Sequence, residues 1–275
     1  MNLWLEAVGF MAIVISGVLL GRLFSRLQKP YWLCGYFFSL ILIAILATMK
    51  CSTALSFLPP FSWIATGRAR FIILAWAITT GLITPLSRLP RMCEKYVVSV
   101  LTVVFVGVFS VGPLLAPALF RDDLSNLRTK VDSDGICLQS RGYTCGPAAA
   151  VTALRKLGFH AQEGEIAVLA YTSPVTGTLP KCLYSALRDR YAGEGLKCRY
   201  RYFNSIAQLK GTGITLAIVR DAFLLDHCVA VLEVSGRTVV VADPVLGRQY
   251  MSCEQFEKIW RFTGIVLERD TTTSI

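Results

Sequence analysis

Four long, almost uncharged stretches dominate the first 120 residues of the chain. Each is close to the roughly 20 residues that a helix needs to cross the hydrocarbon core of a bilayer. They cover residues 3–20, where Glu6 is the one exception, 31–49, 71–87 and 96–120. The first stretch has no basic leading region and runs into Arg22, so we expect a permanent anchor and not a cleaved signal. The pattern predicts an N-terminal α-helical transmembrane bundle of about four spans over residues 1–120.

A further uncharged stretch, residues 51–67, is interrupted by Pro59 and Pro60. Only Lys50 separates it from the span before it, so an interfacial or re-entrant helix fits better than a fifth crossing. With four crossings, the loops on each side of the membrane collect six Lys and Arg. One set lies in two short loops with a single acid, which under the positive-inside rule slightly favours an extracytoplasmic C-terminal part.

The pattern changes after Phe120, where apolar stretches give way to short, alternating segments. Residues 121–135 are predicted to be a polar linker, and residues 136–270 have the size of one domain. Proline in the first turn and Gly158 after the last predict a helix over 147–157, and a second helix is expected over 180–191. Strands are predicted at 214–219, 227–234, 237–243 and 249–251. Helices followed by strands indicate an α+β domain with an antiparallel sheet.

Composition supports a membrane protein and argues against a nucleic-acid partner. The chain is 54% hydrophobic and 17% charged, with a mean hydropathy of +0.54, which excludes intrinsic disorder. Its net charge is +10. Residues 1–120 hold nine Lys and Arg and two acids, a net of +7, so the remaining residues contribute only +3. The basic excess lies between the apolar stretches, where it would set membrane topology rather than bind DNA or RNA.

Among nine cysteines, one has the surroundings of a nucleophile. No pair shows CxxC spacing, so neither a zinc site nor a redox dithiol is predicted, and the chemistry below needs no cofactor. Cys145 precedes Gly146, Pro147 and an alanine-rich helix, which places its sulfur at a helix N-terminus, where the dipole favours the thiolate. The competing interpretation is a small buried residue at a turn.

A cysteine nucleophile needs a base, and the chain has two histidines. His160 lies beyond the Gly158 helix stop and is predicted to be a surface residue. His227 begins a predicted strand whose hairpin partner ends at Asp243. A two-residue turn at 235–236 would put the Asp243 side chain on the other face. A three-residue loop at 234–236 pairs His227 with Asp243, stacks β-branched residues and matches opposite charges, so we predict that register.

The residues around these positions resemble a known family. Residues 138–148, Leu-Gln-Ser-Arg-Gly-Tyr-Thr-Cys-Gly-Pro-Ala, are similar to the start of the bacteriocin-processing, double-glycine leader cysteine peptidases. Residues 226–231 and 241–244 are similar to that family's histidine strand and Asp-Pro turn. The resemblance covers about residues 136–268 and includes Gln, Cys, His and Asp in order, with six residues from Gln139 to Cys145.

The resemblance implies a papain-like cysteine peptidase in a bacterial inner membrane. It implies that Cys145 is the nucleophile, His227 the general base and acid, Asp243 the orienting carboxylate and Gln139 the oxyanion donor. It further implies cleavage of a peptide or protein substrate after small residues, commonly a Gly-Gly pair that ends a leader.

Two features of the chain differ from the family pattern. Thr144 stands where many members have aspartate, and no GxxxxGK[ST] phosphate loop of an exporter ATPase is present. A separate exporter is therefore the expected partner. The alternative function is a non-catalytic, peptidase-like domain that binds a leader peptide and presents it to that exporter.

Overall fold

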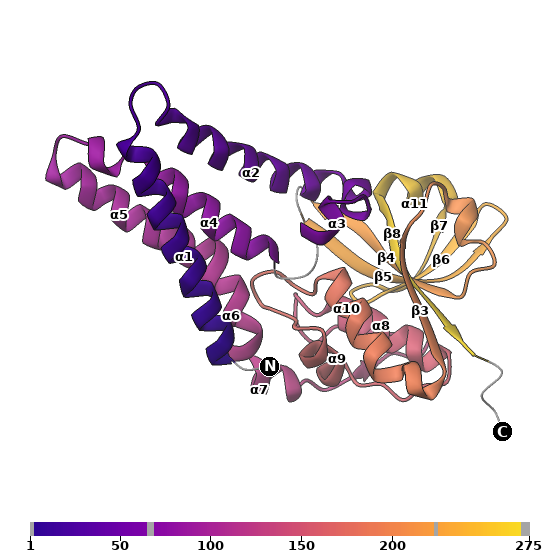
Figure 1. Cartoon of the computed structure of the whole chain (residues 1–275). Helices are drawn as coiled ribbons and strands as arrows, with labels where there is room; N and C mark the ends of the chain where they lie inside the picture. Colours follow the sequence, from indigo (N-terminus) through magenta and orange to yellow (C-terminus); the bar gives the residue numbers. More distant parts are fainter. Residues whose placement is uncertain (1–2, 65–68, 223–224, 271–275) are drawn as a thin grey trace. The chain divides into compact units, whose positions relative to one another are not determined.

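The computed structural model describes residues 3–64, 69–222 and 225–270. The chain divides into two compact units, which Figure 1 shows in full. One unit consists of residues 1–52 and 59–118, and the other of residues 53–58 and 119–275. Each unit has its own packing and is described by itself.

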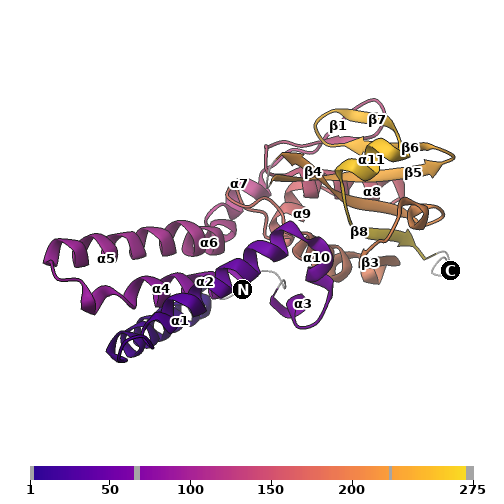
Figure 2. The same ribbon diagram turned by 90° about the horizontal axis from the view of Figure 1, so that it is seen from above.

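The first unit is built from long apolar helices. Its α-helices are α1 (Leu3–Arg26), α2 (Leu33–Cys51), α3 (Phe61–Ile64), α4 (Ala69–Ile83), α5 (Met92–Val106) and α6 (Gly112–Leu119). Four helical stretches, 8–26, 33–51, 69–88 and 92–119, are long and apolar enough to cross a membrane. This confirms four long apolar helices where the four spans were expected. Figure 2 shows how α5 runs on into α6, through a π-helical turn at Gly107–Val111.

Small residues bring the helices of this unit together. α4 contacts α1, α2 and α5. A Cβ on Gly21 of α1 would stand 2.9 Å from the Cβ of Ile83, and one on Gly35 of α2 would meet Thr84. Large apolar side chains point outward instead, among them Phe37, which is 62% exposed. Close packing through glycine with apolar groups outside is typical of helices in lipid and is consistent with a membrane protein.

The segment expected as one interfacial helix has a different structure. It forms a 3₁₀ turn η1 (Thr53–Phe57) and the short α3, and residues 65–67 lie outside the described residues. The Thr53 hydroxyl donates to the Arg261 carbonyl oxygen (2.8 Å), and the Phe57 ring lies 4.9 Å from that of Tyr200. Two prolines interrupt the helical pattern, and the residues before them pack within the second unit.

The second unit is an α+β domain around one six-stranded antiparallel sheet, as predicted. The strand order is β3-β8-β4-β5-β6-β7. These strands are β3 (Leu196–Tyr202), β4 (Ile214–Ala222), β5 (Leu225–Ser235), β6 (Thr238–Asp243), β7 (Gly247–Ser252) and β8 (Trp260–Arg269). A two-stranded sheet pairs β1 (Lys130–Val131) with β2 (Cys137–Leu138). The helices are α7 (Arg121–Ser125), α8 (Cys145–Lys156), α9 (Glu163–Leu169), α10 (Pro180–Tyr191) and α11 (Cys253–Ile259).

Both predicted helices and all four predicted strands of this domain are present, with small changes of boundary. Sequence patterns missed α9, α11, β3 and β8. The expected linker, residues 121–135, also contains α7 and β1. Gly164 lets α9 pack closely against α7, because a Cβ there would stand 2.7 Å from the Leu124 carbonyl oxygen.

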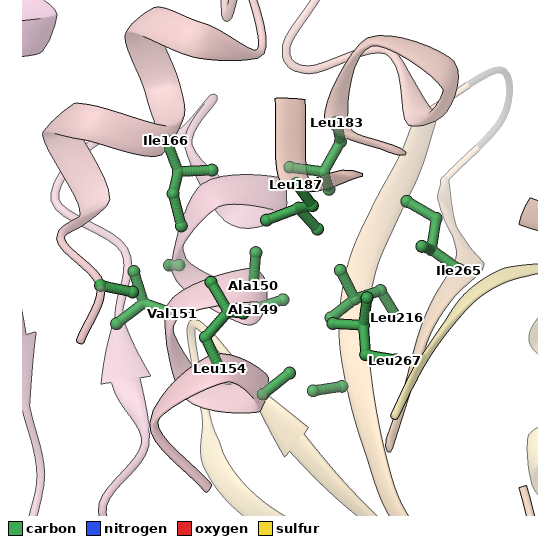
Figure 3. Packing of buried hydrophobic residues seen from close by; sticks show 14 of the residues in the cluster. Ala149, Ala150, Val151, Leu154, Ile166, Leu183, Leu187, Leu216, Ile265 and Leu267 are labelled. Atoms are coloured by element: carbon green, nitrogen blue, oxygen red, sulfur yellow. The ribbon is translucent and has the colours of Figure 1, made fainter. Parts of the chain in front are cut away.

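The sheet buries side chains on both faces. Residues Leu216 and Ile218 of β4 join a cluster with α8, α9 and α10, whereas Ala217 and Val219 join one on the other face that includes Phe256 of α11. This alternation follows from the two-residue period of a strand. Figure 3 shows the first cluster, in which small and branched residues of α8 face leucines of the sheet.

Candidate active site

Cys145 is the first residue of α8 and is partly exposed. Thr144 precedes it as the N-cap residue but makes no side-chain cap. Its hydroxyl instead donates to the Arg141 carbonyl oxygen (2.9 Å) and accepts from the Arg141 N–H (3.2 Å). The N–H groups of the first helical turn are therefore left for an anion at the cysteine. Thr144, which stands where many family members have aspartate, therefore closes the turn that leads into α8.

The position of α8 is set by apolar packing. Ala148, Ala149 and Ala150 are completely buried, and the helix contacts β4 and β5. Alanine side chains let the helix approach the sheet closely, which brings its first turn to the strands that carry the other candidate residues. Gly146 allows a second close approach, because a Cβ there would stand 3.1 Å from the Cβ of Thr178.

His227 and Asp243 form a direct pair. The His227 Nε2 atom lies 3.1 Å from Oδ1 of Asp243, and both side chains are about 15% exposed. The same oxygen accepts from the N–H of Val245 (2.7 Å) and, at 3.3 Å, from that of Leu246. Because Nε2 is used for the carboxylate, Nδ1 is the ring nitrogen left for another partner.

The Cys145 side chain is the second group that affects the charge of this ring. Burial lowers the pKa of the His227 ring, but the interactions with Asp243 and with Cys145 outweigh burial and raise this pKa to about 10. Burial raises the pKa of Asp243, yet the His227 hydrogen bond and the two backbone N–H groups hold it below its usual value. The arrangement therefore favours an imidazolium between a carboxylate and a sulfur.

The hairpin that carries this pair has a different register from the one predicted. The turn is the two residues Gly236 and Arg237, with Gly236 at a φ of +55°, a conformation suited to glycine at the first position of a type II′ turn. A β-bulge between Val231 and Glu233 leaves Leu232 unpaired. The observed pairs are Ala230 with Ala242, Val231 with Val241, Glu233 with Val240, Val234 with Val239 and Ser235 with Thr238. His227 lies beyond these pairs and meets Asp243 at the strand end.

Gln139 lies beside the turn that follows Asp243. Its N–H donates to the Pro244 carbonyl oxygen (2.9 Å). The terminal Oε1 position of its side chain is buried and has no hydrogen-bond partner among the described residues. A buried amide end without a protein partner is uncommon and is costly unless a ligand uses it. His160 is exposed, as predicted, and its carbonyl oxygen accepts from the Tyr191 hydroxyl (3.2 Å).

One buried acid near Gln139 was missed by the sequence analysis. Glu163 is completely buried and accepts hydrogen bonds from both the N–H and the hydroxyl of Ser140. At the start of a short helix it looks like an ordinary acidic first-turn residue, and no sequence signal separates it from Glu165. All nine cysteines are free thiols, and no group of three potential metal ligands occurs among the residues that the structure describes.

An α+β domain with a cysteine at the start of a helix and a histidine on an antiparallel sheet has the architecture of the papain-like class. The chain belongs to the peptidase C39 family, whose model matches residues 134–274.

Known proteins are similar to about half of the chain. An uncharacterized protein of Methanothermobacter marburgensis is 30% identical over 148 residues, which are 54% of this chain and 98% of that protein. The peptidase domain of Streptococcus ComA, a bi-functional ABC transporter, is 17% identical and covers 48% of this chain and 96% of its own, with a TM-score of 0.42. A double glycine motif protease from a PCAT transporter, solved with its leader peptide, is 17% identical, covers 53% and 96%, and has a TM-score of 0.42.

Proposed function

We propose that this chain is a membrane-anchored cysteine peptidase in which Cys145, His227 and Asp243 act together, with Gln139 as an oxyanion donor. The observation that carries the proposal is the contact of the Asp243 carboxylate with the His227 ring, in a domain where Cys145 begins the helix that packs on the strand of His227. Membership of the peptidase C39 family supports the reaction class.

In the proposed acylation step, the Cys145 sulfur attacks the carbonyl carbon of the scissile peptide bond and forms a carbon–sulfur bond. His227 gives its proton to the leaving nitrogen, so the amine departs and a thioester remains. Water then attacks the thioester while His227 takes a proton from it, which releases the acid product and restores the thiolate. Asp243 keeps the ring oriented and stabilises the imidazolium in both steps.

The oxyanion that forms in each step needs two hydrogen-bond donors. The Cys145 N–H, at the free end of α8, supplies one. The Gln139 side chain supplies the other, and its unpaired buried end supports this role. Because the oxygen and nitrogen of an amide are assigned from their hydrogen bonds, the position now held by Oε1 is equally a position for the NH₂ donor.

A peptide ending in small residues such as Gly-Gly is the substrate that the motif at 139–148 favours through its resemblance to leader peptidases. A leader peptide on a protein destined for export, and an exporter on a separate chain, are the corresponding partners. The loop charges slightly favour a peptidase outside the cytoplasm, whereas the odd number of cysteines beside Cys145 in the domain, with Cys145 itself needed as a thiol, favours a reducing compartment. A reporter fused after Ile275 tests the outward orientation, which activity on the cytoplasmic side alone would contradict.

The function is tested with the full-length protein in detergent micelles, a thiol-directed peptidase probe and a fluorogenic peptide cut after Gly-Gly. We expect Cys145→Ala to abolish both labelling and cleavage. Cys253→Ala, which removes another partly exposed thiol of the same domain, is the matched control and should retain both. Labelling that persists in Cys145→Ala would refute the assignment. A wild type that binds the peptide without cleaving it, and does so equally after His227→Ala, would identify a peptide-binding domain instead.

A further inference from the structure

The segment that holds Gln139 is fixed by a buried polar contact that the proposed chemistry does not use. Glu163 is 0% exposed, and no Lys, Arg or His of the described residues forms an ion pair with it. Its Oε1 accepts from the Ser140 N–H at 2.9 Å, and its Oε2 accepts from the Ser140 hydroxyl at 2.6 Å. Both hydrogen bonds therefore go to the residue directly after Gln139.

This contact is itself anchored on both sides. The Glu163 N–H donates to the Thr129 hydroxyl (2.9 Å), which holds the start of α9 to the segment before β1. On the other side, the Gln139 N–H donates to Pro244, one residue after Asp243. The backbone at 139–140 is thus held between the turn that follows Asp243 and a buried carboxylate at the start of α9.

Stability alone gives little reason for such a carboxylate. A buried acid without a cationic partner pays a desolvation cost, and apolar residues of similar volume are often as stabilising as buried charged groups. Two hydrogen bonds to one residue do, however, restrict that residue to one position and orientation. The residue next to it carries the amide that the proposed mechanism needs in a defined place.

We propose that Glu163 is a positioning residue, which through Ser140 fixes the Gln139 side chain where the oxyanion forms. This inference rests on the proposed function. Acyl transfer requires the donor to be in place when the charge develops, and losing one such donor typically costs about 10²- to 10³-fold in rate. Simple alkylation of Cys145 by iodoacetamide develops no oxyanion, so Glu163 should not affect it.

The test measures kcat and KM for the Gly-Gly peptide, together with the rate of Cys145 alkylation, in the full-length protein. Glu163→Ala should lower kcat by on the order of 10²-fold, as for a lost oxyanion donor, and leave KM and alkylation near their wild-type values. Glu163→Gln keeps an acceptor for the Ser140 N–H and should recover most of the loss. Glu165→Gln, on the same helix but half-exposed and paired with Arg190, is the matched control and should leave all three quantities unchanged.

A double-mutant cycle separates positioning from a general effect on folding. If Glu163 acts through Gln139, then Glu163→Ala or Ser140→Ala should cost nothing further in a Gln139→Ala background. If the decreases in kcat of the single variants add in full in the double variant, the inference is wrong. It is also wrong if Glu163→Ala has the kcat of the wild type. If Glu163→Ala does not fold, the cycle with Ser140→Ala decides the question. A wild type without Cys145-dependent cleavage would instead refute the proposed function.

Discussion

The two sides of the candidate site are held in place by different forces. The helix side, α8 with Cys145, is fixed by completely buried alanines against the sheet. The hairpin side, His227 and Asp243, is fixed by hydrogen bonds at the ends of two strands. Apolar packing determines where a backbone lies, whereas hydrogen bonds determine how a ring is turned and charged. Substitutions on the helix side should therefore change stability, and those on the hairpin side should change chemistry.

The largest effect is expected from Asp243→Asn on the hairpin side. The amide can still accept from the Val245 N–H, but it no longer stabilises the imidazolium, and the corresponding change in serine peptidases costs on the order of 10⁴-fold in kcat. Thermal unfolding should also occur at a lower temperature, because the folded state loses the carboxylate that favours the charged ring. Kinetics on the Gly-Gly peptide and circular-dichroism melting curves measure the two quantities. Asp134→Asn, an exposed aspartate of the same domain, is the control, and an equal loss of kcat there would contradict the comparison.

The charge on His227 should also make stability depend on pH. Its pKa rises from 6.5 to about 10 on folding, so the stabilisation is fully present below pH 6.5 and is lost as pH rises toward 10. The free energy of unfolding should therefore fall over this range, and His227→Gln should flatten the dependence. Denaturant titrations between pH 6 and pH 10 measure it, in steps of about one unit. His160→Gln removes an exposed histidine and should leave the wild-type slope, whereas parallel curves for wild type and His227→Gln would refute the charge assignment.

The helix side was the easier of the two to predict from sequence. Pro180 and Tyr191 are the predicted and the observed ends of α10, because proline suits a first helical turn. The helix at Cys145 begins two residues before the predicted Pro147, since proline is tolerated anywhere in that turn. In both helices proline gives a local signal for the first turn, and Cys145 lies in the turn that this signal predicts.

The hairpin side depends on features that alternation does not encode. Residues 227–241 alternate well in either register, and the bulge at Leu232 changes the pairing while it keeps the apolar residues on the same face. The contact of His227 with Asp243 was predicted, but for the wrong register. β8 is the last strand in the chain and inserts between β3 and β4, a long-range pairing that no local pattern reveals. Glu163 likewise meets Ser140 and Thr129 only when the domain is folded, because both lie more than twenty residues before it in the chain.

A cavity in the helix side should lower stability without changing chemistry. Leu154 is completely buried near the far end of α8, more than two turns from Cys145. Leu154→Ala should lower the free energy of unfolding by about 2 to 5 kcal/mol, the usual cost of truncating a buried leucine. Measured per folded molecule, kcat should stay near the wild-type value. Leu169→Ala, at a leucine that is 41% exposed, should cost much less, and a large loss of kcat in Leu154→Ala would contradict the separation of the two sides.

Gly146→Ala should give the smallest effect. It tests whether a substitution on the helix side can change chemistry as well as stability. Alanine favours a helix over glycine by about 1 kcal/mol, but its Cβ would stand 3.1 Å from the Cβ of Thr178 and 3.4 Å from Leu183. The gain in helix propensity and the crowding of the added Cβ have opposite effects on stability, so the midpoint of thermal unfolding should change little. The crowding acts directly beside Cys145, however, and the loop at Thr178 must move by a few tenths of an ångström. We therefore expect a modest decrease in kcat/KM from a substitution on the helix side.

The expected decrease is a few-fold, since a displacement of about 1 Å costs on the order of 10²-fold and this one is smaller. Gly193→Ala, where an added Cβ meets nothing within 4 Å, is the control for a glycine replaced in the same domain. Equal kcat/KM in Gly146→Ala and wild type would mean that the loop yields without disturbing the cysteine. In that case the packing of the helix side affects stability alone, and the chemistry depends on Cys145 itself, on the hairpin and on the segment that carries Gln139.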